Sequence, residues 1–163
     1  MISCRHVGRG DGELLDAARA LLLEYGEFLG RGHICLGGLE HEMEILPGEY
    51  AAPGGALLLA LEDDDAAVGC VALRTITTID GSSTGELKRM WVGSAFRGRG
   101  AGQALLSSAL DAARNLGMKT IHLDTVPSRM PEAVKLYRRN GFVECPRYNE
   151  NLADYAQFFW RPL

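Results

Sequence analysis

The sequence has few aromatic residues and no long apolar segment. Of its 163 residues 7% are aromatic, and no apolar run approaches the roughly 20 residues that a membrane-spanning helix requires. The first residues, MISCRHVGRGDGE, lack the apolar core of a secretory signal peptide. We therefore expect a cytoplasmic protein with no membrane partner.

Cysteine is also scarce, and its spacing excludes two common uses. Cys4, Cys35, Cys70 and Cys145 lie far apart and form no Cys-x-x-Cys pair. A zinc site of the usual spacing is thus missing, and a disulfide framework is not typical of a chain of this length. We expect reduced, packed thiols and no metal site.

Two nucleotide-binding patterns and a basic surface are missing as well. The chain has neither a Gly-x-Gly-x-x-Gly fingerprint on its first strand nor the Gly-Lys-Ser/Thr of a Walker loop. Its isoelectric point is about 5.6 and it has no continuous basic stripe. The protein should therefore bind the phosphate backbone of a nucleic acid only weakly, and we expect no nucleic acid partner.

What the sequence does have is the composition of one globular domain, with an uneven distribution of charge. It is 47% hydrophobic and 23% charged, which suffices for a single core in a chain of this length. The net charge is -4, but residues 11–65 carry -11, residues 66–163 carry +5 and residues 1–10 carry +2. This asymmetry predicts ligands of opposite charge for the two parts, unless the charges only face solvent.

The hydrophobic pattern predicts strands and helices in a mixed order. The expected strands cover residues 2–7, 56–61, 66–76, 85–92, 120–125, 142–145 and 156–161, and the expected helices cover 12–29, 39–46, 100–116 and 131–140. This order combines antiparallel hairpins with one strand, helix, strand crossover. The fold class is therefore α+β, around one mixed sheet.

The most informative segment is the turn Arg97-Gly98-Arg99-Gly100-Ala101-Gly102, which lies between an expected strand and a long helix. A helix N-terminus presents unpaired backbone N–H groups, and glycines let an anion approach them closely. The two arginines add positive charge. The turn predicts a phosphate site, with an ordinary strand-to-helix loop as the alternative.

With this turn the sequence resembles the GNAT superfamily of acetyl-CoA-dependent N-acetyltransferases. Arg97, Gly100 and Gly102 match the family's phosphate motif, and three segments follow in the family's order: GELKRMWVGSAFRGRGAGQALL, LDTVPSRMPEAVKLYRRNGF and YAQFFWRPL. The resemblance covers residues 56–163 well and the first third only loosely. It implies one N-acetyltransferase domain over residues 1–163, with an acceptor side in 1–55 and an acetyl-CoA-binding core in 56–163. Its fold would be a mostly antiparallel sheet of about seven strands flanked by about four helices.

The resemblance also assigns residues to the co-substrate, acetyl-CoA. Backbone amides from Arg97 to Gly102 are expected to hold the pyrophosphate, and the edge at Trp91 and Val92 to hydrogen-bond the pantetheine arm. The chain departs from the family at Met130, where relatives often carry an asparagine. The departure predicts that one polar contact to the cofactor, made by the asparagine in relatives, is missing here.

Glu86 is the candidate general base. An alkyl amine has a pKa near about 10.4 and must lose a proton before it attacks a thioester. Glu86 lies where some relatives carry a glutamate base, and strand alternation places it on one face with Lys88 and Met90. The alternative is a carboxylate that only pairs with Lys88 or Arg89.

Tyr137 is the candidate general acid, because a phenol of pKa near about 10 suits protonation of a leaving thiolate. The alternative is a packed tyrosine near a helix end. A backbone N–H near Val92 would stabilise the oxyanion, and transfer would be direct, within a ternary complex. His122 is expected to be structural, and Asp124 and Thr125 are weaker site candidates.

The expected acceptor is a small-molecule or peptide primary amine. The family's first helices border the acceptor cleft, so acidic residues there would favour cationic amines, unless they only face solvent. These residues are Glu24, Glu27, Glu40, Glu42, Glu44 and Glu49. The alternative function is a non-catalytic acetyl-CoA-binding sensor or interaction module on the same fold. The sequence is compatible with a homodimer.

Overall fold

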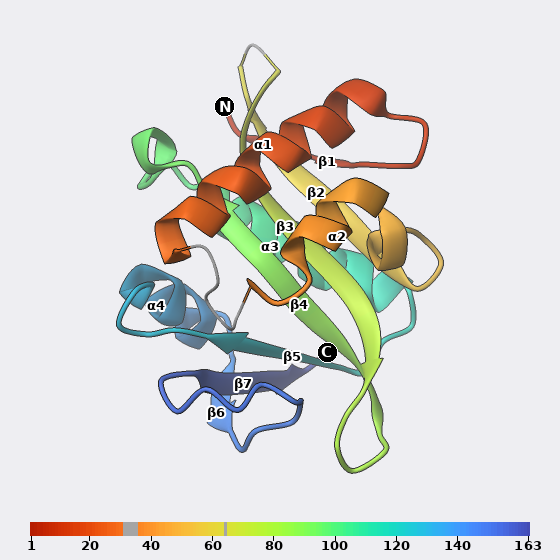
Figure 1. Cartoon of the computed structure of the whole chain (residues 1–163), viewed down its shortest axis with the longest axis vertical. Helices are drawn as coiled ribbons and strands as arrows, with labels where there is room; N and C mark the ends of the chain where they lie inside the picture. Colours follow the sequence, from red (N-terminus) through yellow and green to blue (C-terminus); the bar gives the residue numbers. More distant parts are fainter. Residues whose placement is uncertain (31–35, 64) are drawn as a thin grey trace.

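The computed structural model describes residues 1–30, 36–63 and 65–163, and these form a seven-stranded sheet in the order β1-β2-β3-β4-β5-β7-β6 (Figure 1). The strands are β1 (Ser3–His6), β2 (Gly55–Glu62), β3 (Ala66–Thr77), β4 (Ser83–Val92), β5 (Thr120–Thr125), β6 (Val143–Cys145) and β7 (Gln157–Pro162). Neighbouring strands are antiparallel except β4 and β5, which are parallel.

Helices cover both faces of the sheet. In the view of Figure 1, α1 (Gly12–Leu29) and α2 (Leu39–Ile45) cross in front of it and α3 (Ala101–Asn115) lies behind. The helix α4 (Pro131–Arg139) packs into the same core as α3. Two short 3₁₀ helices within the described residues are Gly48–Tyr50 and Ser94–Phe96.

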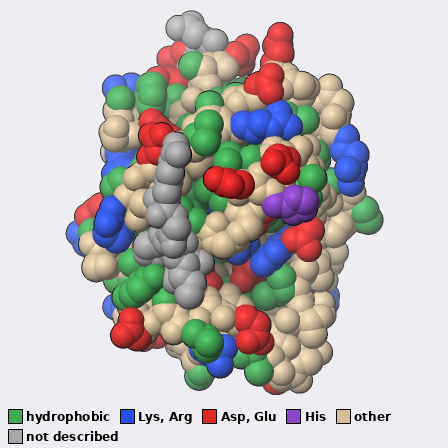
Figure 2. Space-filling model, in the orientation of Figure 1, with side chains coloured by type: hydrophobic (Ala, Val, Ile, Leu, Met, Phe, Trp, Pro, Cys, Tyr) green, Lys and Arg blue, Asp and Glu red, His purple; other side chains and the backbone are tan. Residues whose placement is uncertain are grey.

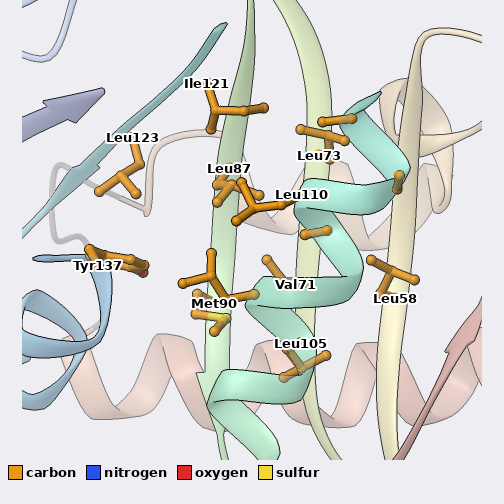
Figure 3. Close-up of a cluster of buried hydrophobic side chains, with 14 of the residues drawn as sticks. Leu58, Val71, Leu73, Leu87, Met90, Leu105, Leu110, Ile121, Leu123 and Tyr137 are labelled. Atoms are coloured by element: carbon orange, nitrogen blue, oxygen red, sulfur yellow. The ribbon is translucent and has the colours of Figure 1, made fainter. Parts of the chain in front are cut away.

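The alternation of side chains along β2 explains why the sheet is covered on both faces. Leu58 and Ala60 belong to the core under α3, whereas Leu57, Leu59 and Leu61 belong to the core under α1 and α2. Successive strand residues point to opposite faces, so an all-apolar strand needs helices on both. Figure 3 shows the α3 side of this arrangement.

The parallel pair β4–β5 is held together over a short length only. Gly85 pairs with Ile121 and Glu86 pairs with His122, and beyond these pairs the two strands are not paired. Figure 1 shows them diverging toward α4. The carboxyl half of β4 therefore has an edge without a strand partner inside the sheet.

A β-bulge shifts the face of every β4 residue that follows it. Cys70 pairs with Trp91 and Ala72 with Lys88, so two β4 residues lie opposite one residue of β3, and the bulge residue Arg89 has φ +58°. Met90 consequently packs into the α3 core, while Trp91 packs under α1. The expectation that Met90 shares a face with Glu86 and Lys88 was therefore wrong, because strict alternation ends at the bulge.

The structure confirms the expected α+β class and the order of strands and helices. The two 3₁₀ helices had no counterpart among the expected elements. Cys4, Cys70 and Cys145 are free thiols, and burial raises the pKa of Cys70 to about 12. Cys35, like Asp64 of the expected acidic turn, lies outside the described residues. No described helix is long and apolar enough to cross a membrane.

Candidate active site

A groove of about 620 Å³ runs from the end of β4 past the N-terminus of α3 to α4. Trp91 and Val92 form part of its wall on β4, and Ala133 and Leu136 form part of its wall on α4. Its lining is mixed, with apolar side chains along the walls and backbone amides at the α3 end. The groove can thus hold a long ligand with a polar end group.

The glycine turn places the start of α3 at one end of the groove. Gly98 and Gly100 have φ +77° and +90°, a left-handed conformation that strains any side chain, and a Cβ on either would touch nothing within 4 Å. Gly100 is the N-cap of α3 and has no side-chain cap. The first N–H groups of a helix lack partners within the helix. Because Gly100 has no Cβ to cover them, those of α3 are open to the groove.

Of the arginines that line the groove, Arg97 and Arg129 lie beside Phe28. The guanidinium of Arg97 is 4.7 Å from the centre of the Trp91 ring and 5.4 Å from the centre of the Phe28 ring. The guanidinium of Arg129 is also 5.4 Å from the centre of the Phe28 ring. Both line the groove with Phe28. Their charges add to the partial positive charge of the α3 N-terminus.

The groove contains all but one of the residues predicted to bind the cofactor: Trp91, Val92, Arg97, Gly98, Gly100, Ala101 and Gly102. The exception is the side chain of Arg99, which forms an ion pair with Glu62 at 3.1 Å and lies over the Phe96 ring. Arg129 was not predicted as a cofactor-binding residue, although it lies within the family-like segment LDTVPSRMPEAVKLYRRNGF, because it is 27 residues beyond Gly102 and only the fold brings it to the groove. Met130, the departure from the family pattern, also lines the groove.

A second, smaller cavity of about 30 Å³ lies where β4 and β5 part. Lys88, Asp124 and Tyr137 line it from β4, β5 and α4. Met90 and Met130 line both the groove and this cavity, so the two adjoin. A ligand in the groove can therefore present one end to the ionisable groups of the cavity.

Tyr137 lines this cavity from α4. Its side chain is buried, and Figure 3 shows its ring extending from α4 toward Met90 on β4. Its hydroxyl makes no hydrogen bond with any residue that the structure describes. Burial, supported by the charge of Asp124, raises the pKa of Tyr137, so the phenol stays protonated at neutral pH.

Glu86 occupies a different environment from the one expected of a base. Only 2% of the residue is exposed. Oε1 accepts a hydrogen bond from Arg74 Nε at 3.0 Å and forms an ion pair with Arg74 Nη2 at 2.9 Å. Oε2 accepts hydrogen bonds from the Tyr148 hydroxyl at 2.7 Å and Asn149 Nδ2 at 3.2 Å. Burial alone would raise the pKa of Glu86, but Lys88, Tyr148 and Arg74 outweigh it and lower the pKa.

This environment does not favour the predicted general-base role of Glu86. A base needs a lone pair open to the amine and a pKa near the working pH, whereas this carboxylate is saturated and its pKa is lowered. Neither predicted surface pairing, with Lys88 or with Arg89, is formed either. The sequence pattern missed Arg74, Tyr148 and Asn149 as its partners.

Three of the six acidic residues that were expected to face the acceptor are engaged by other side chains. Glu24 accepts a hydrogen bond from Trp91 Nε1 at 2.7 Å, and Glu49 pairs with Arg74 at 2.7 Å. Glu42 pairs with Arg89 at 2.9 Å. Figure 2 shows acidic side chains interspersed with basic and apolar ones on this face. At three of the six expected positions the acid is thus used within the fold.

The pair Glu42–Arg89 anchors α2 to the bulge of β4. The Arg89 side chain is 2% exposed, and its Nε and Nη2 donate to the two oxygens of Glu42, each at 2.9 Å. The Tyr50 hydroxyl also donates to Glu42, at 2.8 Å. Burial would raise the pKa of Glu42, but the hydrogen bonds and charge of Arg89 and the bond from Tyr50 lower it.

We expect Glu42→Gln to destabilise the protein by about 3 kcal/mol, because the buried Arg89 loses its counterion. The pKa of Glu42 is lowered on folding, so its contribution is present above the ordinary carboxyl pKa and is lost as pH falls through the lower folded value. Urea unfolding from pH 7 to pH 3 measures both effects. The matched control is Glu44→Gln, whose side chain is 77% exposed and which should leave stability unchanged. Equal stability of the two variants would contradict this role.

Comparison with known proteins gives a consistent result. The Acetyltransferase (GNAT) family matches residues 21–142. An uncharacterised N-acetyltransferase of Schizosaccharomyces pombe is 29% identical over 137 residues, which are 84% of this chain and 81% of the relative.

Solved structures share the fold. A GNAT-family acetyltransferase of Staphylococcus aureus superposes with a TM-score of 0.76 at 21% identity, covering 100% of this chain and 99% of its own. The PaiA N-acetyltransferase of Thermoplasma acidophilum, solved in complex with coenzyme A, has a TM-score of 0.71 at 18% identity, with coverage of 100% and 99%. The groove and cavity thus lie in a fold common to these proteins.

Proposed function

Because the chain belongs to the GNAT family of acetyltransferases, we propose that it moves the acetyl group of acetyl-CoA to a primary amine by direct transfer in a ternary complex. Family membership makes the protein an acyltransferase, which favours an enzyme over a non-catalytic sensor. The observation that carries the proposal is the junction of the groove with the cavity of Tyr137. It provides a place for a long anionic donor and, at its end, a place for an amine.

The residues of the groove fit acetyl-CoA. CoA carries about four negative charges at neutral pH, which suit the amides of the α3 N-terminus together with Arg97 and Arg129. The pantetheine arm has amide groups that match the edge of β4 at Trp91 and Val92, which no strand covers, although the Val92 carbonyl already accepts a hydrogen bond from Arg97 Nε at 3.1 Å. A structural neighbour bound to coenzyme A supports this donor class. The donor supplies an activated thioester, whereas the protein selects and orients the acceptor.

Tyr137 is the acid in this proposal. When the carbon–sulfur bond breaks, the sulfur leaves as a thiolate, and the Tyr137 phenol gives it a hydrogen bond or a proton. A raised pKa keeps this proton in place until the thiolate forms. A backbone N–H near Val92 would stabilise the preceding oxyanion.

Glu86 acts in this proposal as a positioning residue. Its carboxylate holds Arg74 on β3 and Tyr148 of the loop after β6 against β4. It thereby fixes β4 at the residues where the strand separates from β5.

We expect Glu86→Gln to lower kcat/KM by between about 10- and 100-fold at every pH from 6.5 to 9.5, because a displaced β4 misplaces the reactants. Tyr148→Phe removes one hydrogen bond to Glu86 but keeps its charge, and should lower the rate by less, with the same flat profile. The kcat/KM profile of both variants measures this. A deficit that shrinks as pH rises and the amine deprotonates itself would restore the base role of Glu86.

A screen of amines tests the proposed function. The purified protein is mixed with acetyl-CoA and each amine, and release of the CoA thiol is followed. With one good acceptor, the rate with acetyl-CoA is then compared with the rates with acyl-CoA donors of longer chain length. Thiol release that depends on the amine supports the proposal, whereas binding of acetyl-CoA without turnover on any amine would favour the sensor.

A further inference from the structure

Lys88 brings a positive charge into the cavity without a partner of its own. It lines the cavity from β4, and its ammonium group makes no hydrogen bond or ion pair with any described residue. The two neighbouring cations are different, because Arg74 pairs with Glu86 and Glu49, and Arg89 pairs with Glu42. Burial, followed by the charge of Arg89, lowers the pKa of Lys88. The charges of Glu86 and Asp124 act in the opposite direction, although neither carboxylate forms an ion pair with Lys88. A ligand group that supplies a further negative charge in direct contact would stabilise the ammonium.

Asp124 supplies a partly free carboxylate on the other side of the cavity. Its Oδ2 accepts hydrogen bonds from Asn149 at 2.7 Å and Asn151 at 3.4 Å. Its Oδ1 accepts none from the residues that the structure describes. The cavity is also lined by Arg89, which is paired with Glu42, whereas Lys88 and Asp124 form no ion pair with each other. It therefore offers one cation and one carboxylate that are not joined in an ion pair, each from a different strand.

This arrangement distinguishes between classes of acceptor. A polyamine would place a second cation beside Lys88, and two of the acidic residues from this side of the sheet, Glu42 and Glu49, are already paired with Arg89 and Arg74. A carboxylate beside Lys88 would instead form a charge-assisted bond in a partly desolvated site. The cavity, at about 30 Å³, has room for about two or three water-sized groups, which suits a compact head group.

We propose that the acceptor is an amino acid type zwitterion, whose carboxylate binds Lys88 and whose amino group faces Asp124 as it meets the thioester. The inference rests on the proposed function and names its substrate class. The amine nitrogen forms a bond to the acetyl carbon as the carbon–sulfur bond breaks. The ammonium loses two protons, one to the thiolate through Tyr137 and one to solvent, giving an N-acetyl amino acid and the CoA thiol.

The test compares each amino acid with its carboxamide, which keeps the amine and removes the negative charge. The wild-type protein should acetylate the best amino acid with a kcat/KM about 10- to 100-fold above that of its amide, the range expected for one hydrogen bond to a charged group. Lys88→Met should bring the acid down to the level of the amide by raising KM, and Lys88→Arg should restore part of the difference. The control is Lys135→Met, on the exposed face of α4, which should change neither substrate.

Asp124→Asn completes the design, because the amine is common to both substrates. It should lower the rate with the acid and with the amide alike. An acceptor screen in which neutral or cationic amines react and amino acids do not would overturn the inference and leave the proposed function intact. Equal losses with acid and amide in Lys88→Met would also overturn it. Absence of thiol release with every amine, together with no thermal stabilisation by acetyl-CoA, would instead remove the proposed function.

Discussion

Tyr137→Phe should lower turnover by about 10- to 1,000-fold while the protein stays folded and binds acetyl-CoA. The ring remains, with its contact to Phe142 at 5.8 Å between ring centres, and the lost hydroxyl has no partner among the described residues. Water acting as a substitute acid sets the lower end of the range. Initial rates of thiol release, with the thermal shift caused by acetyl-CoA, measure the two properties separately.

Tyr155→Phe is the matched control for this variant. Tyr155 is 44% exposed and lines neither the groove nor the cavity, so removal of its hydroxyl should leave turnover unchanged. Wild-type turnover in Tyr137→Phe would make Tyr137 a packing residue. Loss of the acetyl-CoA thermal shift would show that the hydroxyl contributes to the binding of the donor rather than to the reaction.

Gly100→Val should abolish stabilisation by acetyl-CoA. At a concentration 100 times its dissociation constant, the ligand should add about 2.7 kcal/mol to the free energy of unfolding of the wild type. The valine side chain would stand over the α3 amides, in a backbone conformation with φ +90° that disfavours any Cβ. Unfolding by heat or urea with and without acetyl-CoA gives the difference directly.

Gly117→Val controls for the backbone strain. Gly117 follows the other end of α3, has φ +79° and likewise has no atom within 4 Å of an added Cβ. Both variants should lose about 1–2 kcal/mol of stability from the left-handed conformation. Only Gly117→Val should keep the acetyl-CoA shift. A full shift in Gly100→Val would contradict the assignment of the turn to the phosphates.

The periodicity of apolar residues was sufficient to predict the helices and strands, because it reflects local backbone geometry. The helix over residues 12–29 and the strand over 120–125 were expected with the bounds that the structure has. In both, apolar residues recur with the spacing of one buried face. The glycine turn was recognisable for a similar reason, since its conformations and the start of α3 belong to one continuous segment.

The remaining features depend on contacts between distant residues. The bulge at Arg89 accompanies a buried pair with Glu42, 47 residues earlier, and nothing within β4 itself indicates it. Glu86 is bound by Tyr148, which is 62 residues away. Sequence spacing identifies a carboxylate at the right depth of the sheet, but only the folded arrangement shows whether its lone pairs are free. The same holds for Lys88, which, unlike Arg74 and Arg89, forms no ion pair with any residue that the structure describes.

The separation of β4 from β5 creates a sheet edge in the interior of the protein. Edge strands usually expose N–H and C=O groups that recruit another chain, with a risk of aggregation. Here α1 and α4 contribute to the walls beside the opening, which keeps this edge away from bulk solvent. In our proposal the amide-bearing arm of the donor lies along it and takes the place that an added strand would fill. Binding of the donor would then extend the hydrogen-bonded order of the sheet, and its release would leave that edge unpaired until the next molecule arrives.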